Sequence, residues 1–321
     1  MRKLRFILNT FVSGPQAWFF LADDLGYFRD EGIEIDFSPG DTAANAVPRV
    51  ASGEFDVGYG DINALIELTA KSAAPPNALA VFATFNASPY TIAVPASSAI
   101  LAPIDLQDRT LGAHPKDAAW LMLPEFAAQS GMDLRRISVE FSPDPHPQMI
   151  RVMLEEARWA GLFGFVNTLN SAAIEAKIDP AALRHLQYRD VVPDLYGCAL
   201  LVQRSLAARE PALVAGLVRA VNRGLVATLT DLDRAIDAVA RRNPQIDRKA
   251  NRARLAGTLA LEMAHAEGTR LGIGEVDDAR LARAAALIVR AKGYARCPVP
   301  RELFDRQFMP PLTDRVTSLA P

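Results

Sequence analysis

The sequence predicts an α/β protein whose sheets are mostly parallel. Up to Val202, short runs rich in β-branched and aromatic residues alternate with longer amphipathic runs. Strands and helices that alternate in this way are typical of a sheet covered by helices on both faces. From Pro211 onward the pattern changes to long helical segments. The chain of 321 residues is long enough for two domains of ordinary size.

The first third of the chain contains a strand, a glycine-containing turn and a helix in direct succession. They lie in the segment GEFDVGYGDINALIELT, residues 53–69. Gly58 and Gly60 are expected to relax the backbone of the turn through the conformational freedom of glycine. Asp61 is expected to cap the helix that follows. The strands expected in this third are 4–8, 33–37, 55–58, 79–85 and 90–94, and the helices are 16–31, 42–52 and one from residue 62.

The middle of the chain repeats the alternation, and the last third is helical. The strands expected in the middle are 109–113, 137–141, 161–166, 183–188 and 196–202, with helices 117–129, 146–157 and 167–177. The last third is expected to form helices 212–228, 233–242, 248–266 and 277–291, and then an irregular, proline-punctuated tail at 297–312.

Charge and hydropathy argue against two classes of partner. The formal net charge is −2, and no run of lysine or arginine stands out. Electrostatics therefore gives little support to a nucleic-acid partner or an anionic membrane surface. No apolar segment approaches the roughly 20 residues that cross a bilayer, so a membrane-spanning helix is not expected.

The N-terminal segment MRKLRFILNTFVSG has basic residues and some apolar character. Arg5, Asn9 and Thr10 interrupt the apolar run, which makes it a poor core for a signal peptide. Two interpretations stay open: the protein works in the cytoplasm, or a leader has been removed.

The two cysteines, Cys198 and Cys297, lie in neither a CxxC nor a Cys/His pattern. A structural zinc site is therefore not expected, and no metal ligand is predicted. Cysteine often behaves as a small core residue, so two packed thiols are favoured over a disulfide.

Motifs for nucleotide binding and hydrolysis are missing. The segment GYGDIN matches only the start of G-x-G-x-x-G, with Asn63 in place of the third glycine, and no Walker A motif is present. There is no G-x-S-x-G elbow, and none of the four histidines has HExxH spacing: His114, His146, His185 and His265. A triad built from distant residues stays open, but no catalytic residue and no cofactor is predicted.

Three junctions between a strand and a helix are rich in small or polar residues: 38–44, 58–63 and 114–120. In parallel sheets the strand carboxyl ends and the helix N-termini share one edge, where ligands bind. The N–H groups and the dipole at a helix start favour electron-rich ligand atoms. The junctions together would therefore make a polar pocket. The alternative is that their polar residues serve only as helix caps: Asp41, Thr42, Asp61 and Asp117.

Aromatic residues near these junctions would add an apolar side to such a pocket. They are Trp18, Phe19, Tyr59, Trp120, Phe165 and Tyr196. Tyr59 is the favoured candidate, because its flanking glycines are expected to expose the ring. Trp120 is the next candidate, because it lies in the first turn of its helix. The alternative for each aromatic residue is a place in the core.

Three sequence blocks together resemble one family. They are GYFRDEG, then GEFDVG, then DLQDRTLG, all within residues 14–133. Their order resembles the NMT1/THI5-like branch of periplasmic substrate-binding proteins, whose members bind sulfonates, nitrate or thiamine precursors. Alternation of strands and helices extends the likeness to about Val202.

The resemblance implies the type II periplasmic-binding-protein fold: two α/β lobes with mostly parallel sheets, joined by two crossover strands. Lobe 1 would comprise 1–90 and 200–321, and lobe 2 would comprise 91–199, with a ligand cleft between them. The crossovers would lie near 88–95 and 193–202. Hinge closure about a solute is the corresponding motion. The implied partner is an ABC permease, the implied location is the periplasm, and a monomer is expected.

The family's pocket-forming loops, matched position by position, imply a set of ligand-binding residues. In lobe 1 they are Thr10, Phe11, Trp18, Asp41, Thr42, Ala43, Tyr59, Gly60 and Asp61, with Asn86 and Ser88 at the first crossover. In lobe 2 they are Lys116, Asp117, Trp120, Gly164 and Phe165, with Tyr196 at the return crossover. Lys116 would suit an anionic head group, or it is a solvated surface lysine.

The chain departs from the family at Arg158 and Trp159, where many members carry an acidic and a small residue. Arg158 either makes a bidentate contact to an oxyanion or faces solvent. Yeast-type pyrimidine synthases on this fold carry a cysteine-rich iron-binding segment. This chain has no such cluster, so their chemistry is not expected.

The resemblance thus implies the solute-binding component of an ABC importer, which clamps a small organic or anionic solute and makes no bond. Pyrimidine-like thiamine precursors and sulfonates are the expected ligand classes, and the aromatic residues favour a flat ring. The alternatives are an enzyme that acts on a bound heterocycle and a cytoplasmic ligand sensor.

Overall fold

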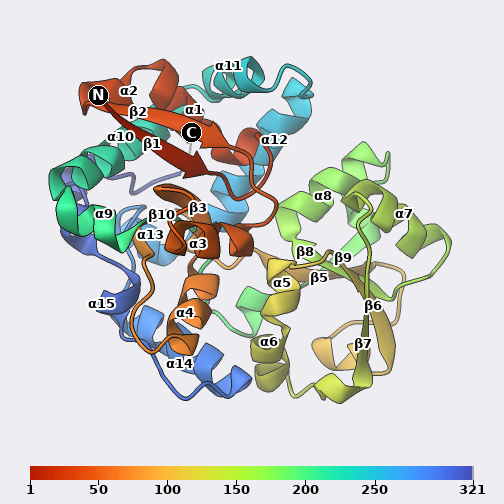
Figure 1. The fold of residues 1–321 in the computed structure, drawn as a ribbon. Coiled ribbons are helices and arrows are strands. Elements are labelled where there is room, and N and C mark those ends of the chain that lie inside the picture. Colours follow the sequence, from red (N-terminus) through yellow and green to blue (C-terminus); the bar gives the residue numbers. More distant parts are fainter. Residues whose placement is uncertain (320–321) are drawn as a thin grey trace. The chain divides into compact units, whose positions relative to one another are not determined.

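The computed structural model, which describes residues 1–319, consists of two compact units (Figure 1). Unit 1 contains Met1–Ala87, Tyr196–Val289 and the chain from Tyr294 onward. Unit 2 contains Ser88–Leu195 and Arg290–Gly293. This division differs slightly from the expected one. The strand that starts at Cys198 lies wholly in the sheet of unit 1, whereas residues 88–90 belong to unit 2.

Unit 1 is built on a five-stranded mixed sheet in the order β2-β1-β3-β10-β4. β1 pairs parallel with β2 and β3, whereas β10 runs antiparallel to both of its neighbours. The one antiparallel strand is therefore the strand by which the chain re-enters unit 1. The strands are β1 Arg2–Ile7, β2 Ile33–Ser38, β3 Val57–Asp61, β4 Leu79–Ala83 and β10 Cys198–Val202.

The glycines of β3 let helix α3 (Ala43–Ala51) pack directly on the sheet. A Cβ atom on Gly58 would lie 2.6 Å from Val50 Cγ2, and one on Gly60 would lie 3.1 Å from the carbonyl oxygen of Ala43. Both glycines lie inside the strand and serve close packing of backbone against helix. The prediction that they relax a turn is wrong, because the strand runs on to the residue that caps the next helix.

Helices surround the sheet of unit 1 (Figure 1). α3 and α4 pack against β3, and α10 packs against α1. The helices are α1 Ala17–Asp24, α2 Tyr27–Asp30, α3, α4 Ile62–Lys71, α9 Arg204–Arg209, α10 Pro211–Thr230, α11 Leu232–Arg242, α12 Arg248–Thr258, α13 Ala266–Leu271, most of α14 Asp278–Lys292, and α15 Pro300–Leu303. Shorter turns are η1 Gly14–Gln16, a π-helical turn η6 Leu259–Met263, η7 Arg306–Phe308 and η8 Leu312–Asp314.

Two expected helices are interrupted by residues that constrain the backbone. The helix expected at 16–31 ends at Asp24, and Gly26 adopts a left-handed conformation with a φ of 77°. The helix expected at 117–129 divides into α5 (Ala118–Leu121) and α6 (Leu123–Ser130). Pro124 stands in the first turn of α6 and has no N–H with which to continue the preceding helix.

Unit 2 is built on a second five-stranded sheet in the order β7-β6-β8-β5-β9. β6 pairs parallel with β7 and β8, whereas β5, by which the chain enters unit 2, runs antiparallel to β8 and β9. The strands are β5 Tyr90–Pro95, β6 Arg109–Ala113, β7 Ile137–Phe141, β8 Gly161–Phe165 and β9 Leu183–Gln187. The helices are α5, α6, α7 His146–Glu155 and α8 Val166–Glu175, with turns η2 Pro103–Leu106, η3 Leu134–Arg136, η4 Pro180–Ala182 and η5 Tyr188–Asp190.

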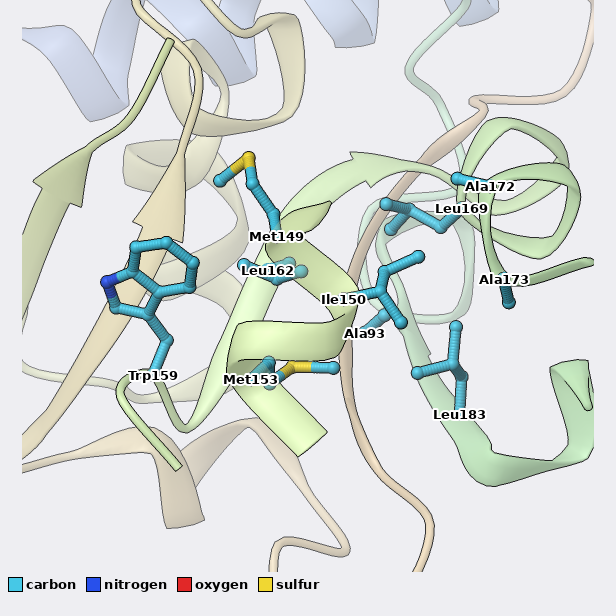
Figure 2. Close-up of a cluster of buried hydrophobic side chains, with 10 residues drawn as sticks. All are labelled: Ala93, Met149, Ile150, Met153, Trp159, Leu162, Leu169, Ala172, Ala173 and Leu183. Carbon is cyan, nitrogen blue, oxygen red and sulfur yellow. The ribbon is translucent and has the colours of Figure 1, made fainter. Parts of the chain in front are cut away.

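A hydrophobic cluster under α7 and α8 forms part of the core of unit 2. Figure 2 shows Trp159 at one end of this cluster and Leu183 at the other, with Leu162 of β8 between them. A Cβ atom on Gly112 would lie 2.8 Å from Cδ2 of Trp159, so the indole fills the space that this glycine leaves. The packing of this cluster therefore depends on the large indole of Trp159 lying beside Gly112, which has no side chain.

Within residues 1–319, one helix is long and apolar enough to span a membrane by length and composition, namely α10, Pro211–Thr230. The prediction that no segment approaches this length is therefore wrong. α10 packs against α1, and its Leu217, Val221 and Leu225 are buried in unit 1. A core helix meets the same criteria, so α10 is weak evidence for a membrane span.

Both cysteines are free thiols. Cys198 is buried in β10, in agreement with the expected packed thiol, whereas Cys297 is exposed rather than packed. Burial raises the pKa of the Cys198 thiol well above its ordinary value.

Acidification is expected to destabilise unit 2 through His185 of β9. Its Nε2 lies 2.8 Å from Asn170 Oδ1, and its Nδ1 finds no hydrogen-bond partner among the described residues. Burial lowers the pKa of His185 from 6.5 to about 4, so the folded state keeps the ring neutral where the unfolded chain binds a proton. Stability is therefore fully present above about pH 6.5 and falls by roughly 2–3 kcal/mol as the pH drops to about 4.

Urea unfolding of unit 2 at several pH values, compared between the wild type and His185→Gln, measures this effect. The wild type should lose more stability than the variant over this pH range. Parallel pH profiles for the two proteins would contradict the assignment.

Candidate functional site

The carboxyl ends of β1 and β2 bring two predicted loops together in unit 1. The backbone N–H of Gly40 donates to the carbonyl of Thr10 at 3.0 Å, and a Cβ on Gly40 would lie only 2.0 Å from the carbonyl oxygen of Leu8. The side chain of Gln16 donates to Asn9 Oδ1 at 2.6 Å and to Thr10 Oγ1 at 3.0 Å. Thr10 therefore lies in a fixed loop at the edge where ligands bind in such sheets.

Phe11 is a predicted residue of unit 1 that is open to solvent, with an exposed fraction of 58%. The guanidinium carbon of Arg254, from α12, lies 5.5 Å from the centroid of its ring. Sequence reasoning did not single out Arg254, because it lies in the C-terminal helices, where no motif was found.

The loop after β2 contains the predicted residues Asp41, Thr42 and Ala43. Thr42 is the cap of α3: its side chain accepts a hydrogen bond from the N–H of Asn45 at 3.2 Å. Asp41 accepts two hydrogen bonds from the side-chain amide of Asn45, each 2.8 Å long. Ala43 is buried. The loop is therefore preorganised by Asp41 and Thr42 together.

Tyr59, the favoured aromatic candidate, is fully buried, so the prediction that its flanking glycines expose the ring is wrong. Side chains alternate along a strand, and Tyr59 points away from α3, toward Phe19 and Trp18 of α1. Its hydroxyl lies 2.6 Å from Thr84 Oγ1, and burial raises its pKa well above the ordinary value. Trp18 is buried in the same way.

Two further candidates of unit 1 have structural roles. Asp61 is the cap of α4 and accepts from the N–H of Asn63 at 2.7 Å. It is buried, as is Gly60, which packs against α3. The cap interpretation of Asp61 is confirmed, and neither residue is exposed to solvent.

The predicted crossover residues Asn86 and Tyr196 belong to a buried polar network in unit 1. The hydroxyl of Tyr196 donates to Glu267 Oε1 at 2.8 Å, and Asn86 Nδ2 lies 3.3 Å from the same oxygen. Arg280 pairs with Glu267 at 3.2 Å, donates to the carbonyl of Asn86 at 2.7 Å and covers the ring of Tyr196 at 4.0 Å. These predicted residues therefore tie the crossover points to α13 and α14 of unit 1. Ser88, at the start of unit 2, is also buried.

The carboxyl end of β6 in unit 2 leads into the predicted residues Lys116, Asp117 and Trp120. Lys116 is exposed and has a positive φ of 63°. Asp117 is buried and accepts from the N–H groups of Ala119 at 2.8 Å and Trp120 at 3.1 Å, which confirms its role as a cap. Burial raises the pKa of Asp117, although both N–H groups oppose that rise.

Trp120 is half-buried and contacts the exposed Phe141 and the buried Phe163. Its ring makes edge contacts to Phe141 at 5.9 Å and to Phe163 at 5.7 Å. Phe141, at the end of β7, is largely exposed and was not predicted. Phe165 at the end of β8 is partly exposed beside Tyr90, at 5.7 Å.

Gly164 of β8 faces Leu169, whose side chain would lie 3.0 Å from an added Cβ atom. This predicted residue thus lets α8 pack closely on the strand, and it presents no side chain to a solute.

The structure also brings His114 and His146 together, although they are distant in the sequence. Their ring centroids are 4.4 Å apart, with an interplanar angle of 81°. His114 follows β6 and His146 starts α7, so the pair lies at the carboxyl edge of this sheet. Sequence spacing gave no signal for this pair, since only the parallel pairing of β6 and β7 brings the two loops together.

Arg158 pairs with Glu140 at 3.0 Å and lies over the ring of Trp159 at 4.8 Å. The indole N–H of Trp159 donates to the same carboxylate at 2.8 Å, and both neighbours lower the pKa of Glu140. Of the two interpretations of Arg158, the structure favours a surface contact to Glu140.

Among the described residues of unit 1, two cavities stand out, and neither is lined by a predicted residue. The first, of about 290 Å³, is lined mainly by paired charges, among them Arg270, Glu275, Arg306 and Arg315. The second, of about 370 Å³, is apolar and lies between α10, α11, α12 and the turn η6. In the part of the chain that the structure describes, no group of three or more His, Cys, Asp or Glu side chains is placed to hold a metal.

Solved structures share this fold. The alkanesulfonate-binding protein SsuA from Xanthomonas axonopodis pv. citri, bound to MOPS, is 16% identical with a TM-score of 0.69, covering 95% of this chain and 98% of its own. The ligand-binding component of an ABC-type import system from Staphylococcus aureus is 13% identical with a TM-score of 0.68, covering 99% and 100%. A variant of the desulfurization enzyme DSZB with biphenyl-2-sulfinic acid is 14% identical with a TM-score of 0.64, covering 98% and 99%.

These likenesses show the periplasmic-binding-protein type of fold, with two mixed sheets. No curated protein matches the sequence significantly. The family model described as NMT1/THI5 like matches residues 16–235, which is more than half of the chain. The chain therefore belongs to the NMT1/THI5-like family.

Proposed function

We propose that this protein is the solute-binding component of an ABC importer and that it binds a small organic anion without chemical change. The observation that carries this proposal is the composition of the two sheet edges. The edge of unit 1 presents Phe11 and Arg254, and the edge of unit 2 presents Trp120 and Phe141. Aromatic surface beside a few polar groups is typical of small-molecule sites.

The structure weakens one argument for a flat heterocycle. Trp18, Tyr59 and Tyr196, three of the aromatics that favoured such a ligand, are buried in unit 1. A sulfonate-like anion is the better proposal, and two of the structural relatives support it: one is an alkanesulfonate-binding protein and another is an aliphatic sulphonate binding protein. Under this proposal a membrane permease receives the solute, and the protein works as a periplasmic monomer.

The second candidate is an enzyme, because one protein with this fold is a desulfurization enzyme. Against this candidate, the Cys198 thiol is buried with a raised pKa, which makes it a poor nucleophile. A binding screen with product analysis separates the two functions. MOPS, benzenesulfonate, benzoate, nitrate and an aminopyrimidine are added in turn, and the melting temperature and the added compound are both followed.

An organic anion is expected to stabilise the protein. At about 100 times its Kd, a ligand that binds only the folded state adds roughly 2.7 kcal/mol of stability. Stabilisation by the aminopyrimidine alone would favour the thiamine-precursor class, and disappearance of a bound compound would favour the enzyme.

A further inference from the structure

The cavity of about 290 Å³ in unit 1 is lined by groups of both charges. Three arginines and three acidic residues contribute to its wall, from residues 270–278, which connect α13 to α14, and from residues 306–315 of the C-terminal tail. We infer that this cavity binds a small zwitterion of the amino-acid class, with an ammonium group, a carboxylate and an apolar side chain. None of its lining residues belongs to the predicted solute-binding set, so the inference goes beyond the proposed function.

Two ion pairs at the rim of the cavity are open to solvent. Arg270 pairs with Asp277 at 2.6 Å, and Arg306 pairs with Asp278 at 2.6 Å. The two arginine side chains are 59% and 49% exposed. The N–H of Arg280 and the side chain of Arg270 lower the pKa of Asp277, which keeps its carboxylate charged at neutral pH. Because exposed ion pairs contribute little to stability, a ligand can exchange them for contacts of its own.

A third ion pair, which is largely buried, fixes the wall of the cavity. Arg315 pairs with Glu275 at 3.2 Å, and it also donates to the carbonyls of Leu271 at 2.9 Å and Pro310 at 2.7 Å. Gly272 has a φ of 76°, and an added Cβ atom there would lie 2.6 Å from the Cβ of Arg315. Arg315 therefore holds the tail against the loop between α13 and α14, and the cavity is preorganised.

The equal numbers of positive and negative groups select the class of ligand. A purely anionic molecule would bring its charge beside three carboxylates, and a purely cationic one would bring its charge beside three guanidinium groups. Like charges placed side by side are unfavourable. In a zwitterion, the carboxylate binds the guanidinium groups of Arg270 and Arg306, and the ammonium group binds Asp277 and Asp278. Each member of the two rim ion pairs thus gains an oppositely charged group of the ligand.

The size and the apolar part of the cavity favour a molecule as large as an amino acid. Small-molecule sites measure about 300–1,000 Å³, so a cavity of about 290 Å³ lies at the lower limit of this range. Leu271 and Leu312 also line it, and Leu312 is 50% exposed. An aliphatic side chain of the ligand would cover this leucine and remove apolar surface from water.

The loop that lines the cavity also contacts the buried polar network of unit 1. The N–H of Asp277 donates to the hydroxyl of Tyr196 at 3.2 Å, and the carbonyl of Glu275 accepts from the side chain of Asn86 at 3.2 Å. A bound zwitterion would hold this loop in place through Asp277. Hydrogen exchange in the first turn of α14 is therefore expected to slow when the cavity is occupied.

The test uses probes that share one side chain and differ in charge. Binding of L-leucine is measured by calorimetry and compared with N-acetyl-L-leucine, which keeps only the carboxylate, and with L-leucinamide, which keeps only the ammonium group. The proteins are the wild type, Arg270→Gln and Asp278→Asn. The matched control is Arg252→Gln, which removes an exposed ion pair with Asp233 outside the cavity. Circular dichroism and melting temperature confirm that each variant is folded.

The wild type should bind leucine at least about fivefold more tightly than either derivative, since about fivefold is the upper range of one ion pair near the surface. Arg270→Gln should weaken leucine by a similar factor and leave leucinamide unchanged. Asp278→Asn should weaken leucine and leave N-acetyl-leucine unchanged. Arg252→Gln should change none of the three, and leucine should slow hydrogen exchange in the first turn of α14.

Three results would overturn the zwitterion site. They are equal binding of leucine and its two derivatives by the wild type, an equal loss of leucine binding in Arg252→Gln and Arg270→Gln, and no binding of leucine at all. Each of these outcomes is separate from the proposed function, because the binding of benzenesulfonate or MOPS to the wild type is measured independently and involves none of the residues that line this cavity.

Discussion

Replacing Arg280 with methionine is expected to lower the free energy of unfolding of unit 1 by about 3–5 kcal/mol. Arg280 and Glu267 form a buried ion pair at 3.2 Å, with exposed fractions of only 6% and 5%. The variant leaves the carboxylate of Glu267 uncompensated in the core and removes the donor to the carbonyl of Asn86. A buried charge without its partner is more costly than a missing pair.

Two further variants test whether the unpaired, buried charge of Glu267 causes this loss of stability. Arg270→Met removes a largely exposed partner of Asp277 and should cost no more than about 1 kcal/mol. Adding Glu267→Gln to Arg280→Met should recover part of the loss, because both charges are then absent. Urea unfolding, with hydrogen exchange in β10 as the readout for unit 1, measures each free energy. Equal losses for Arg280→Met and Arg270→Met would contradict the role of burial.

Trp159→Ala is expected to destabilise unit 2 by about 3–5 kcal/mol. The indole is 2% exposed and fills the space beside Gly112, next to Leu162 and Met149 (Figure 2). Truncation leaves a cavity that the neighbouring strand cannot close without moving. It also removes the N–H donor to Glu140.

The matched control is Ile174→Ala, which truncates a largely exposed apolar side chain of α8 in the same unit. Its cost should stay within about 0.5 kcal/mol, as for ordinary surface substitutions. Urea unfolding followed by hydrogen exchange in β8 reports on unit 2. A loss below about 1 kcal/mol for Trp159→Ala would show that the cluster repacks around the missing ring.

Much of the fold is visible in the sequence because periodicity is a local signal. β6 and β7 coincide with the expected ranges 109–113 and 137–141. The caps Thr42, Asp61 and Asp117 were also predictable, since a cap depends only on residues within one turn. The antiparallel direction of β5 and β10 does not follow from local pattern, and the resemblance to a family supplied the two crossovers.

The site was harder to predict, because burial depends on distant segments. Tyr59 was expected to be exposed, but the face of β3 that it occupies is covered by α1. Arg254 was missed because only the docking of η1 on α12 brings it to Phe11. A signal was present in RKANRARLAG, where Arg248 and Arg252 share one helical stripe and Arg254 does not. The ligand contacts proposed for these residues stay predictions.

The claim that the protein binds an organic anion and leaves it unchanged is tested most directly by recovery of the bound compound. The protein is incubated with an excess of benzenesulfonate or MOPS, separated from unbound compound by gel filtration, and denatured. Nuclear magnetic resonance then identifies and quantifies what is released. The proposed function predicts a single, chemically intact molecule per chain for at least one of these anions. Recovery of a new product, or of no compound at all, would contradict it.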